Sequence, residues 1–458
     1  MTTFNVLADL LEVTALPARL MSQVAFTGED IVLPSSFQVE RAASASIAAT
    51  GLAAALLHEA RGGEAQEVSV NTRHACAAFH SEHFTRIDGK WVPRELGDIA
   101  GLYRTANGGW VRLHTNFAHH RAMMLDFLRC APTKAAVAAA LAPRDAFEIE
   151  AEAIARNLTV SARRSFAEWD SHPHREAVDT LPLIRIEKIG DAPPADWKRG
   201  ASPLDGLRVV DLTRVIAGPV STRSLAAHGA DVMTISPPQL AAFAAPDLGR
   251  GKRQAFVDLR TPDGAARLWA LIGEADVFVQ GYRPGTLAAR GFSPEAVAAR
   301  RPGIVCASLN AYGNAGPWSF RRGFDSLVQT ATGFNHAEAE AFGQQTPRPL
   351  PVQALDHGTG YLLALGMLAA LYRRQTEGGS WHVSVSLVRT GHWVRSLGRR
   401  SEGLDLHGQH HDAVIDLLEP SASGFGLMEA IRHPAILSAT PARYLRPSVP
   451  PGTDLAQW

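Results

Sequence analysis

The sequence predicts an α/β protein in which a doubly wound parallel sheet is accompanied by a small α+β domain. Beyond residue 200, short apolar segments alternate with helical segments, which is the spacing of strands and crossover helices in a parallel sheet. Between residues 86 and 150, two turn signals are followed by two Ala-rich segments, a pattern typical of hairpins and helices. The length of 458 residues favours two or three domains.

The strands predicted for the large sheet are short apolar runs, at residues 207–212, 232–235, 255–259, 277–279 and 304–309. Helices are predicted to begin at Gly218-Pro219 and at Thr261-Pro262, because proline is tolerated in the first turn of a helix. A further helix is predicted from about Thr359 to Arg374.

The small domain is predicted from its turns and its helical segments. Asp88-Gly89 and Asn107-Gly108-Gly109 are hairpin signals, because these residues accept the positive φ that tight turns require. The Ala-rich segments predict helices at Lys134–Leu141 and Ala146–Ala155.

A helix-then-strand unit occurs twice in the chain. The first copy has Ala49–Leu56, a Gly-Gly turn and then Val68–Val70; the second has Ala364–Leu371, a Gly-Gly turn and then Val383–Val385. Ahead of the second helix stands Asp356, and the matching place in the first holds Arg41, or Glu40 if the register slips by one. The repeat suggests that one copy carries the active site and that the other copy supports it structurally.

Composition excludes several classes of protein. Lys+Arg and Asp+Glu balance at 45 each, so the chain lacks the basic surface expected of a nucleic-acid binder. Three widely separated cysteines form no CxxC pair and indicate a reducing compartment. No signal peptide and no membrane-spanning run is evident, so we expect a soluble cytoplasmic protein with no membrane partner.

Asp356 is the candidate nucleophile. A carboxylate near a helix N-terminus is stabilised as the anion, and an anionic carboxylate can attack a thioester carbonyl. The alternative is a plain helix cap. Loop 213–219 follows the first strand at the edge where open α/β sheets bind ligands, and it lacks GxGxxG, so a nicotinamide cofactor is not indicated. The histidines of the small domain and of residues 407–411 lack metal-binding spacing in a helix, so no metal is expected.

Several blocks resemble the family III CoA-transferases, the CaiB/BaiF group that includes formyl-CoA transferase, carnitine CoA-transferase and α-methylacyl-CoA racemase. The blocks occur in the family's order, at residues 204–219, 229–232, 250–253, 275–285, 312–318 and 323–326, and then at Asp356. The resemblance covers residues 204–390, with 33–80 as a divergent second copy.

The resemblance implies a Rossmann-like sheet and a transferase in which Asp356 forms a mixed anhydride and then an enzyme–CoA thioester. Coenzyme A and acyl-CoA enter as substrates, a carboxylic acid is the acceptor, and no tightly bound cofactor is expected. Family positions that line the CoA site match the following residues, of which Arg214 and Arg283 are assigned only because they lie in the same loops: Arg214, Val215, Ala217, Val257, Arg260, Tyr282, Arg283 and Arg322.

The order of segments departs from the family. The expected divisions are a degenerate copy at 1–85, the small domain at 86–150, a return segment and linker at 151–200, the CoA-binding domain at 201–400, and a connector with a C-terminal return segment at 401–458. We interpret this order as two tandem subunits fused and trimmed. The chain is then either a homodimer or a self-contained pseudo-dimer.

Two other functions stay open from the sequence. The altered CoA loops, such as Gln280-Gly281-Tyr282, are compatible with a catalytically impaired CoA-binding protein. A racemase-like isomerase would need a second base, and Phe324 stands where the racemase branch has histidine. Transfer is therefore favoured over racemisation.

Overall fold

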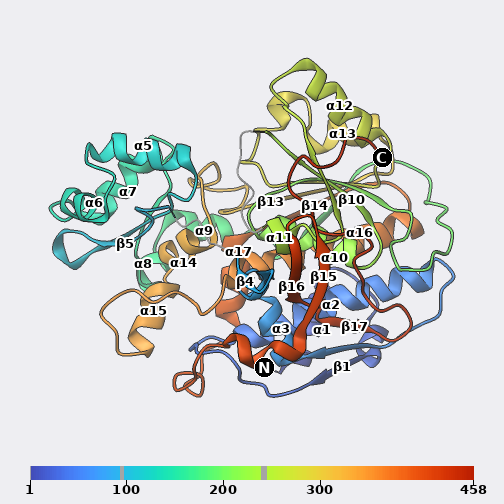
Figure 1. Ribbon diagram of the computed structural model, residues 1–458, viewed down its shortest axis with the longest axis horizontal. Coiled ribbons are helices and arrows are strands. Elements are labelled where there is room, and N and C mark those ends of the chain that lie inside the picture. Colours follow the sequence, from blue (N-terminus) through green and yellow to red (C-terminus); the bar gives the residue numbers. More distant parts are fainter. Residues whose placement is uncertain (1, 93–96, 239–244) are drawn as a thin grey trace.

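A seven-stranded sheet forms the centre of the C-terminal half, residues 201–458, with one edge strand contributed by residues 185–190 (Figure 1). The computed structural model describes residues 2–92, 97–238 and 245–458. Six strands are parallel and the edge strand β8 is antiparallel. The strands, in their order across the sheet, are β11 (Lys252–Phe256), β10 (Asp231–Ser236), β9 (Arg208–Leu212), β12 (Val277–Gln280), β13 (Val305–Asn310), β14 (Ser380–Ser386) and β8 (Arg185–Gly190). The predicted doubly wound sheet is confirmed, and the strand order reverses between β9 and β12.

The helix predicted at Thr261-Pro262 begins where its proline and cap residue indicate, and the helix predicted at Gly218-Pro219 begins one residue earlier, at Ala217. Pro262 opens α12 (Pro262–Gly273), and the side chain of Thr261 accepts a hydrogen bond from Gly264 N at 3.1 Å. The third predicted strand, at 255–259, is wrong in its position: β11 ends at Phe256 because Asp258 and Arg260 pair with each other in the following turn. The other helices of the C-terminal half are α10 (Ala217–Ala227), α11 (Ala245–Leu248), α13 (Pro294–Arg300), α14 (Asp325–Ala331), α15 (Phe334–Ala341), α16 (Ala354–Thr376) and α17 (Leu387–Ser396).

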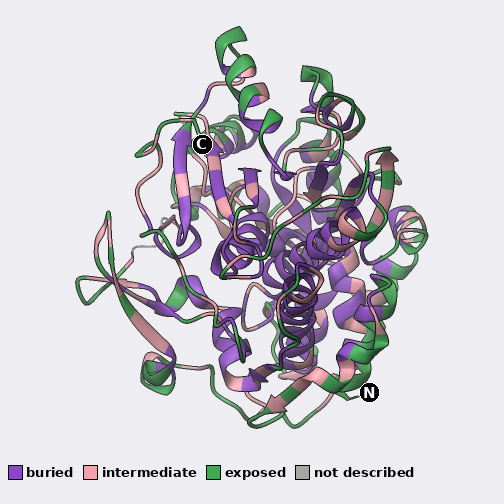
Figure 2. Cartoon of the chain, turned by 90° about the vertical axis from the view of Figure 1, so that its right-hand side faces the viewer, coloured by how far each residue is buried: buried purple, intermediate pink, exposed green. Residues whose placement is uncertain are grey.

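The two copies of the repeat form similar structures. The helices are α2 (Val39–Ala60) and α16, which pack against each other, and Thr50 Oγ1 donates a hydrogen bond to Tyr361 O at 3.1 Å. β2 (Val68–Asn71) is parallel to β1 (Val24–Thr27), as β14 is parallel to β13. Figure 2 shows buried helices gathered at the centre of the molecule, and both copies belong to one hydrophobic core.

The copies exchange their antiparallel edge strands. β8 follows the first copy in sequence and pairs with β14 of the second copy. β17 (Ala435–Leu437) follows the second copy and pairs with β2 of the first. Among the described residues the two copies contact each other. Two separate, non-contacting halves would have contradicted the interpretation as a fused pair.

The small domain lies beside the large sheet (Figure 1). Both predicted hairpins are present: β3 (Arg86–Ile87) with β4 (Lys90–Trp91), and β5 (Gly101–Arg104) with β6 (Trp110–Leu113). α6 (Lys134–Leu141) and α7 (Ala146–Ala155) match the predicted helices, and α5 spans Ala118–Leu128. The core of this domain extends to β7 (Val160–Ala162), past the expected division at residue 150.

The remaining elements surround these parts. β3 pairs with β16 rather than with the small-domain sheet, in a second sheet of order β15-β16-β3-β4. The elements not yet described are α1 (Thr3–Val13), α3 (Thr72–Ala78), α4 (Ser81–Phe84), α8 (Phe166–Asp170), α9 (Pro173–Asp179), β15 (Leu418–Ser423) and β16 (Gly426–Ile431).

In the part of the chain that the structure describes, one helix is long and apolar enough to span a membrane. This helix is α16, and the segment that passes this test is completely buried inside the protein.

Buried histidines predict that the protein loses stability in acid. Burial lowers the pKa of His228 from 6.5 to about 4, and neither ring nitrogen has a hydrogen-bond partner among the described residues. The folded state therefore binds fewer protons than the unfolded chain, so this contribution is complete above pH 6.5 and is lost as the pH falls towards 4. We expect His228 alone to account for a loss of about 3 kcal/mol in the free energy of unfolding.

Urea unfolding at a series of pH values measures this loss. His228→Leu removes no hydrogen bond and is expected to make the decline shallower. His407→Leu, at an exposed histidine, is the control for the substitution itself. An equal decline in His228→Leu and the wild-type protein would contradict the assignment.

Candidate active site

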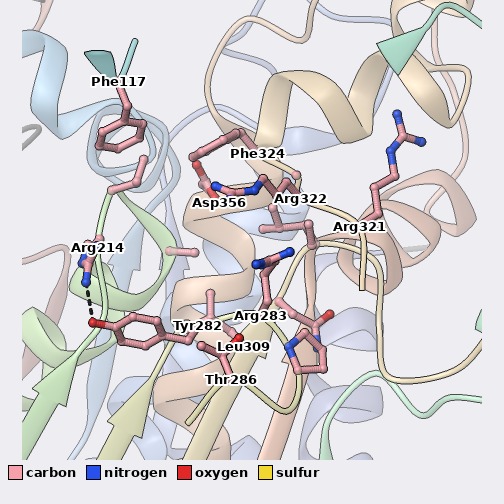
Figure 3. Close-up of a pocket in the computed structure, with 18 of the residues that line it drawn as sticks. Phe117, Arg214, Tyr282, Arg283, Thr286, Leu309, Arg321, Arg322, Phe324 and Asp356 are labelled. Carbon is pink, nitrogen blue, oxygen red and sulfur yellow. Dashed lines mark hydrogen bonds between the residues drawn. The ribbon is translucent and has the colours of Figure 1, made fainter. Parts of the chain in front are cut away.

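A cavity of about 370 Å³ opens at the carboxyl ends of the strands where their order reverses (Figure 3). Open α/β sheets bind ligands at this point, because loops from adjacent strands diverge there to opposite faces. The loops after β9, β12 and β13 line the cavity. The predicted site residues among the lining are Arg214, Val215, Ala217, Tyr282, Arg283, Arg322 and Asp356.

Two predicted residues lie elsewhere. The side chain of Val257 is buried in a separate core with Leu268 and Phe278. Arg260 is at the surface and forms an ion pair with Asp258 at 2.7 Å. Neither lines the cavity, so the assignment of these two residues to CoA binding stays a prediction.

The loop between β9 and α10 is held in a strained conformation. Val215 has a φ of 70°, which a β-branched residue rarely adopts. A Cβ on Gly218 would lie 2.1 Å from Thr213 Cβ, so only glycine allows the loop to fold back on itself. Residues kept in such conformations are concentrated at ligand sites, where the surrounding structure holds them in place.

The cavity has an excess of positive charge. Arg214 contacts Tyr282 through a hydrogen bond to its hydroxyl and lies 4.9 Å from the centre of its ring. Arg283 donates to the amide oxygen of Asn157 at 3.0 Å. Within the described residues, Arg214, Arg283 and Arg322 form no ion pair with a carboxylate. Burial, and then the charge of Arg283, lower the pKa of Arg322, so the cations repel one another and favour an anionic ligand.

The small domain completes the cavity. Phe117, His119 and His120 line it, and His120 Nε2 lies 2.8 Å from Arg322 Nη1. His114 stacks on Phe324, with ring centres 3.7 Å apart. The sequence indicates these histidines only as possible metal ligands and does not reveal that His119 and His120 line the cavity. The cluster of His114, Phe117, His119 and His120 in one short segment was the available signal.

Arg321 belongs to the same loop as Arg322 and also lines the cavity, but its guanidinium points away from that of Arg322, towards the small domain (Figure 3). Its Nη2 donates to Glu150 Oε1 at 2.8 Å, and Glu150 also pairs with Arg164. The loop is thereby anchored to α7.

Asp356 lies within the first turn of α16, not ahead of the helix as predicted. The helix begins at Ala354, with Gln353 as an N-cap whose side chain makes no capping bond. Asp325 provides the cap instead: its Oδ2 accepts the backbone N–H groups of Leu355 at 2.8 Å and Asp356 at 2.9 Å. A Cβ on Gly360 would lie 2.6 Å from Ala217 O, so glycine lets this helix approach the strained loop closely.

Three acids influence one another here. Burial raises the pKa of Asp356 well above its usual range, and the charges of Asp325 and Glu82 raise it further. Burial raises the pKa of Asp325 to about 6, in spite of the two backbone hydrogen bonds that lower it. The pair therefore holds a proton more readily than ordinary aspartates do.

The equivalent position in the first copy is closed. Gln38 is the N-cap of α2, so Arg41 occupies the third helical position, as Asp356 does in α16. Glu40 Oε1 accepts the backbone N–H groups of Val32 at 3.0 Å and Leu33 at 2.7 Å. The segment that precedes α2 therefore covers the start of this helix.

Comparison with known proteins identifies relatives of part of the chain. The CoA-transferase family III model matches residues 204–397. Acetyl-coenzyme A transferase nodX of Hypoxylon pulicicidum is 37% identical over 269 residues, covering 55% of this chain and 45% of that protein. Probable fatty acyl-CoA transferase Rv3272 of Mycobacterium tuberculosis is 33% identical over 203 residues, covering 41% of this chain and 51% of that protein.

A crystal structure of Rv3272 matches with 32% identity and a TM-score of 0.39, covering 43% of this chain and 57% of that one. The chain spans about half the length of the curated relatives it matches.

Proposed function

Because residues 204–397 belong to CoA-transferase family III, we propose that the protein transfers coenzyme A from an acyl-CoA to a carboxylic acid. The observation that carries the proposal is the cavity, which brings a buried carboxylate, Asp356, together with arginines that have no carboxylate partner among the described residues. The arginines suit the phosphates of coenzyme A, and the carboxylate suits attack on its thioester.

The proposed reaction conserves all atoms through two anhydrides. An oxygen of Asp356 attacks the thioester carbonyl, the C–S bond breaks and the CoA thiolate leaves, forming a mixed anhydride. The thiolate then attacks the aspartyl carbonyl, which releases the donor acid and forms an aspartyl–CoA thioester. The acceptor carboxylate attacks the carbonyl of this thioester, the CoA thiolate leaves, and a second mixed anhydride forms between Asp356 and the acceptor. The thiolate finally attacks the acceptor's carbonyl, which forms the acceptor's CoA thioester and releases the carboxylate of Asp356. Each step takes place at Asp356 or its acyl derivative, so this side chain must stay in one position. The first turn of α16, capped by Asp325, holds it there.

Intact-mass measurement tests the proposal. The protein is incubated with acetyl-CoA, succinyl-CoA or a long-chain acyl-CoA and then treated with hydroxylamine. We expect a covalent adduct that maps to Asp356 and is converted to a hydroxamate. CoA binding without any covalent adduct, across all three donors, would favour a CoA-binding protein without activity. Solvent deuterium at the α-carbon of the acyl group without an acceptor would favour the racemase-like alternative.

The acylation rate is expected to depend on pH. Only the ionised carboxylate attacks, so a raised pKa of Asp356 makes the rate increase with pH well beyond the range of an ordinary aspartate. Asp325→Asn keeps an oxygen to cap the helix but removes the like charge, so its profile is expected to move to lower pH. Stopped-flow acylation under single-turnover conditions measures both profiles. Identical pH profiles for the wild-type protein and Asp325→Asn would show that the charge of Asp325 does not affect the ionisation of Asp356.

We propose further that the chain supplies by itself the elements that two subunits of the family contribute. The exchange of β8 and β17 between the copies supports this proposal. Light scattering of the purified protein is expected to give the mass of a monomer, and a dimer mass would favour the homodimer.

A further inference from the structure

Besides α2, which packs along α16, the N-terminal half contacts the first turns of α16 through residues 79–84. Glu82 Oε2 lies 3.0 Å from His357 Nε2, and both side chains are buried. His357 directly follows Asp356 in the first turn of α16. A residue of the first half therefore contacts the residue next to the nucleophile.

Neighbouring contacts fix this segment in place. Phe79 stacks on the rings of His357 and Tyr361, at 5.6 and 5.8 Å between ring centres. Ser81 Oγ donates to Asp247 Oδ2 at 2.7 Å, and Asp247 in turn pairs with Arg223 at 2.6 Å. The segment is thus tied both to α16 and to α10, which carries Arg223.

The bond between Glu82 and His357 sets the orientation of the imidazole. An ionised carboxylate only accepts hydrogen bonds, so Nε2 is the donor to Glu82, and Nδ1 has no hydrogen-bond partner among the described residues. Two acids then hold the first turn of α16 from opposite halves of the chain: Asp325 at the backbone and Glu82 at the His357 side chain.

We propose that Glu82 is a positioning residue for Asp356, acting through its bond to His357, so that the degenerate first half completes the active site of the second. This inference rests on the proposed function. The charged groups that face this turn are Asp325 on α14, Glu82 on α4 and His357 itself, with Asp247 beyond Ser81 and Arg112 beyond Asp325.

Two substitutions of Glu82 test the inference in the full-length protein. Glu82→Gln keeps an oxygen for His357 but removes the charge, so acylation is expected to keep its maximal rate while its pH profile moves to lower pH. Glu82→Ala removes the bond, and the maximal acylation rate is expected to fall by up to about 100-fold, with acyl-CoA affinity little changed. A merely structural glutamate would not move the pH profile of a folded variant.

Glu40→Gln is the matched control. Glu40 is a buried acid at the start of the equivalent helix α2, and it pairs with Arg400 away from the cavity. Its substitution is expected to leave the acylation rate and profile of the folded protein unchanged.

The possible results distinguish a failure of the positioning role of Glu82 from a failure of the proposed function. Unchanged rate and profile in both Glu82 variants would overturn the inference, while an adduct on the wild-type protein would still support the transferase. If Glu82→Ala does not fold, Glu82→Gln decides by its profile alone. If the wild-type protein forms no adduct with any donor, the proposed function fails, and the inference fails with it.

Discussion

Replacing Asp356 with asparagine is expected to abolish the covalent adduct and to lower kcat for CoA transfer by at least about 1,000-fold. The amide has the size of the carboxylate but cannot displace the thiolate, so both anhydrides and the aspartyl–CoA thioester are lost. Folding is not expected to suffer. Asp356 is 7% exposed, and its raised pKa means that ionising it costs stability at neutral pH, so asparagine should unfold at the same or a higher temperature.

Three measurements on one preparation check this prediction. Intact mass after exposure to acyl-CoA reports the adduct, steady-state transfer reports kcat, and titration calorimetry reports affinity for CoA. Affinity close to that of the wild-type protein is expected, since the arginines are untouched. An adduct of unchanged yield in Asp356→Asn would place the nucleophile elsewhere.

Removal of the Glu150 carboxylate is expected to reduce the free energy of unfolding by about 3 to 5 kcal/mol. Glu150 is buried between Arg164 and Arg321, and it also accepts the backbone N–H of Ala162 at 2.9 Å. Burial alone would raise the pKa of Glu150, but the two arginines outweigh it and hold the pKa below its usual range. Glu150→Ala leaves both arginines buried without their charge partner.

Chemical denaturation measures the loss, and α7 offers its own control. Glu152 lies on the same helix as Glu150 and pairs with Arg144, which precedes the helix, but Glu152 is 52% exposed, so Glu152→Ala is expected to cost less than about 1 kcal/mol. Because Arg321 and Arg322 share a loop, Glu150→Ala is also expected to weaken CoA binding. Equal stability of the two variants would show that the buried pair contributes no more than the exposed one.

Local patterns predicted most of the secondary structure. The boundaries of α6 and α7 agree with the sequence, because alanine-rich periodicity and the cap residues Thr133 and Asp145 act within each segment. The start of α16 could not be predicted in this way. Gly358, a poor helix former, follows directly after its first turn, and its cap comes from Asp325 in another helix, so no local residue signals where the helix begins.

The candidate site was predictable in part for the same reason. Arg214, Tyr282 and Asp356 belong to motifs, and the structure brings them to one cavity. Phe117 and His120 enter it only because the small domain folds back onto the large sheet, a long-range contact that no spacing in the sequence reveals. Glu82 was not singled out, because its importance depends on the packing of two distant segments.

The exchanged edge strands have a consequence for how the chain reaches its folded state. Val68 pairs with Leu437, far away in the sequence, so the first copy lacks an edge strand until β17 has been synthesised. Contacts this distant in sequence slow folding, and the unpaired edge of β2 stays open to wrong partners in the meantime. A ribosome-bound chain is therefore expected to need protection by chaperones until β17 has been synthesised.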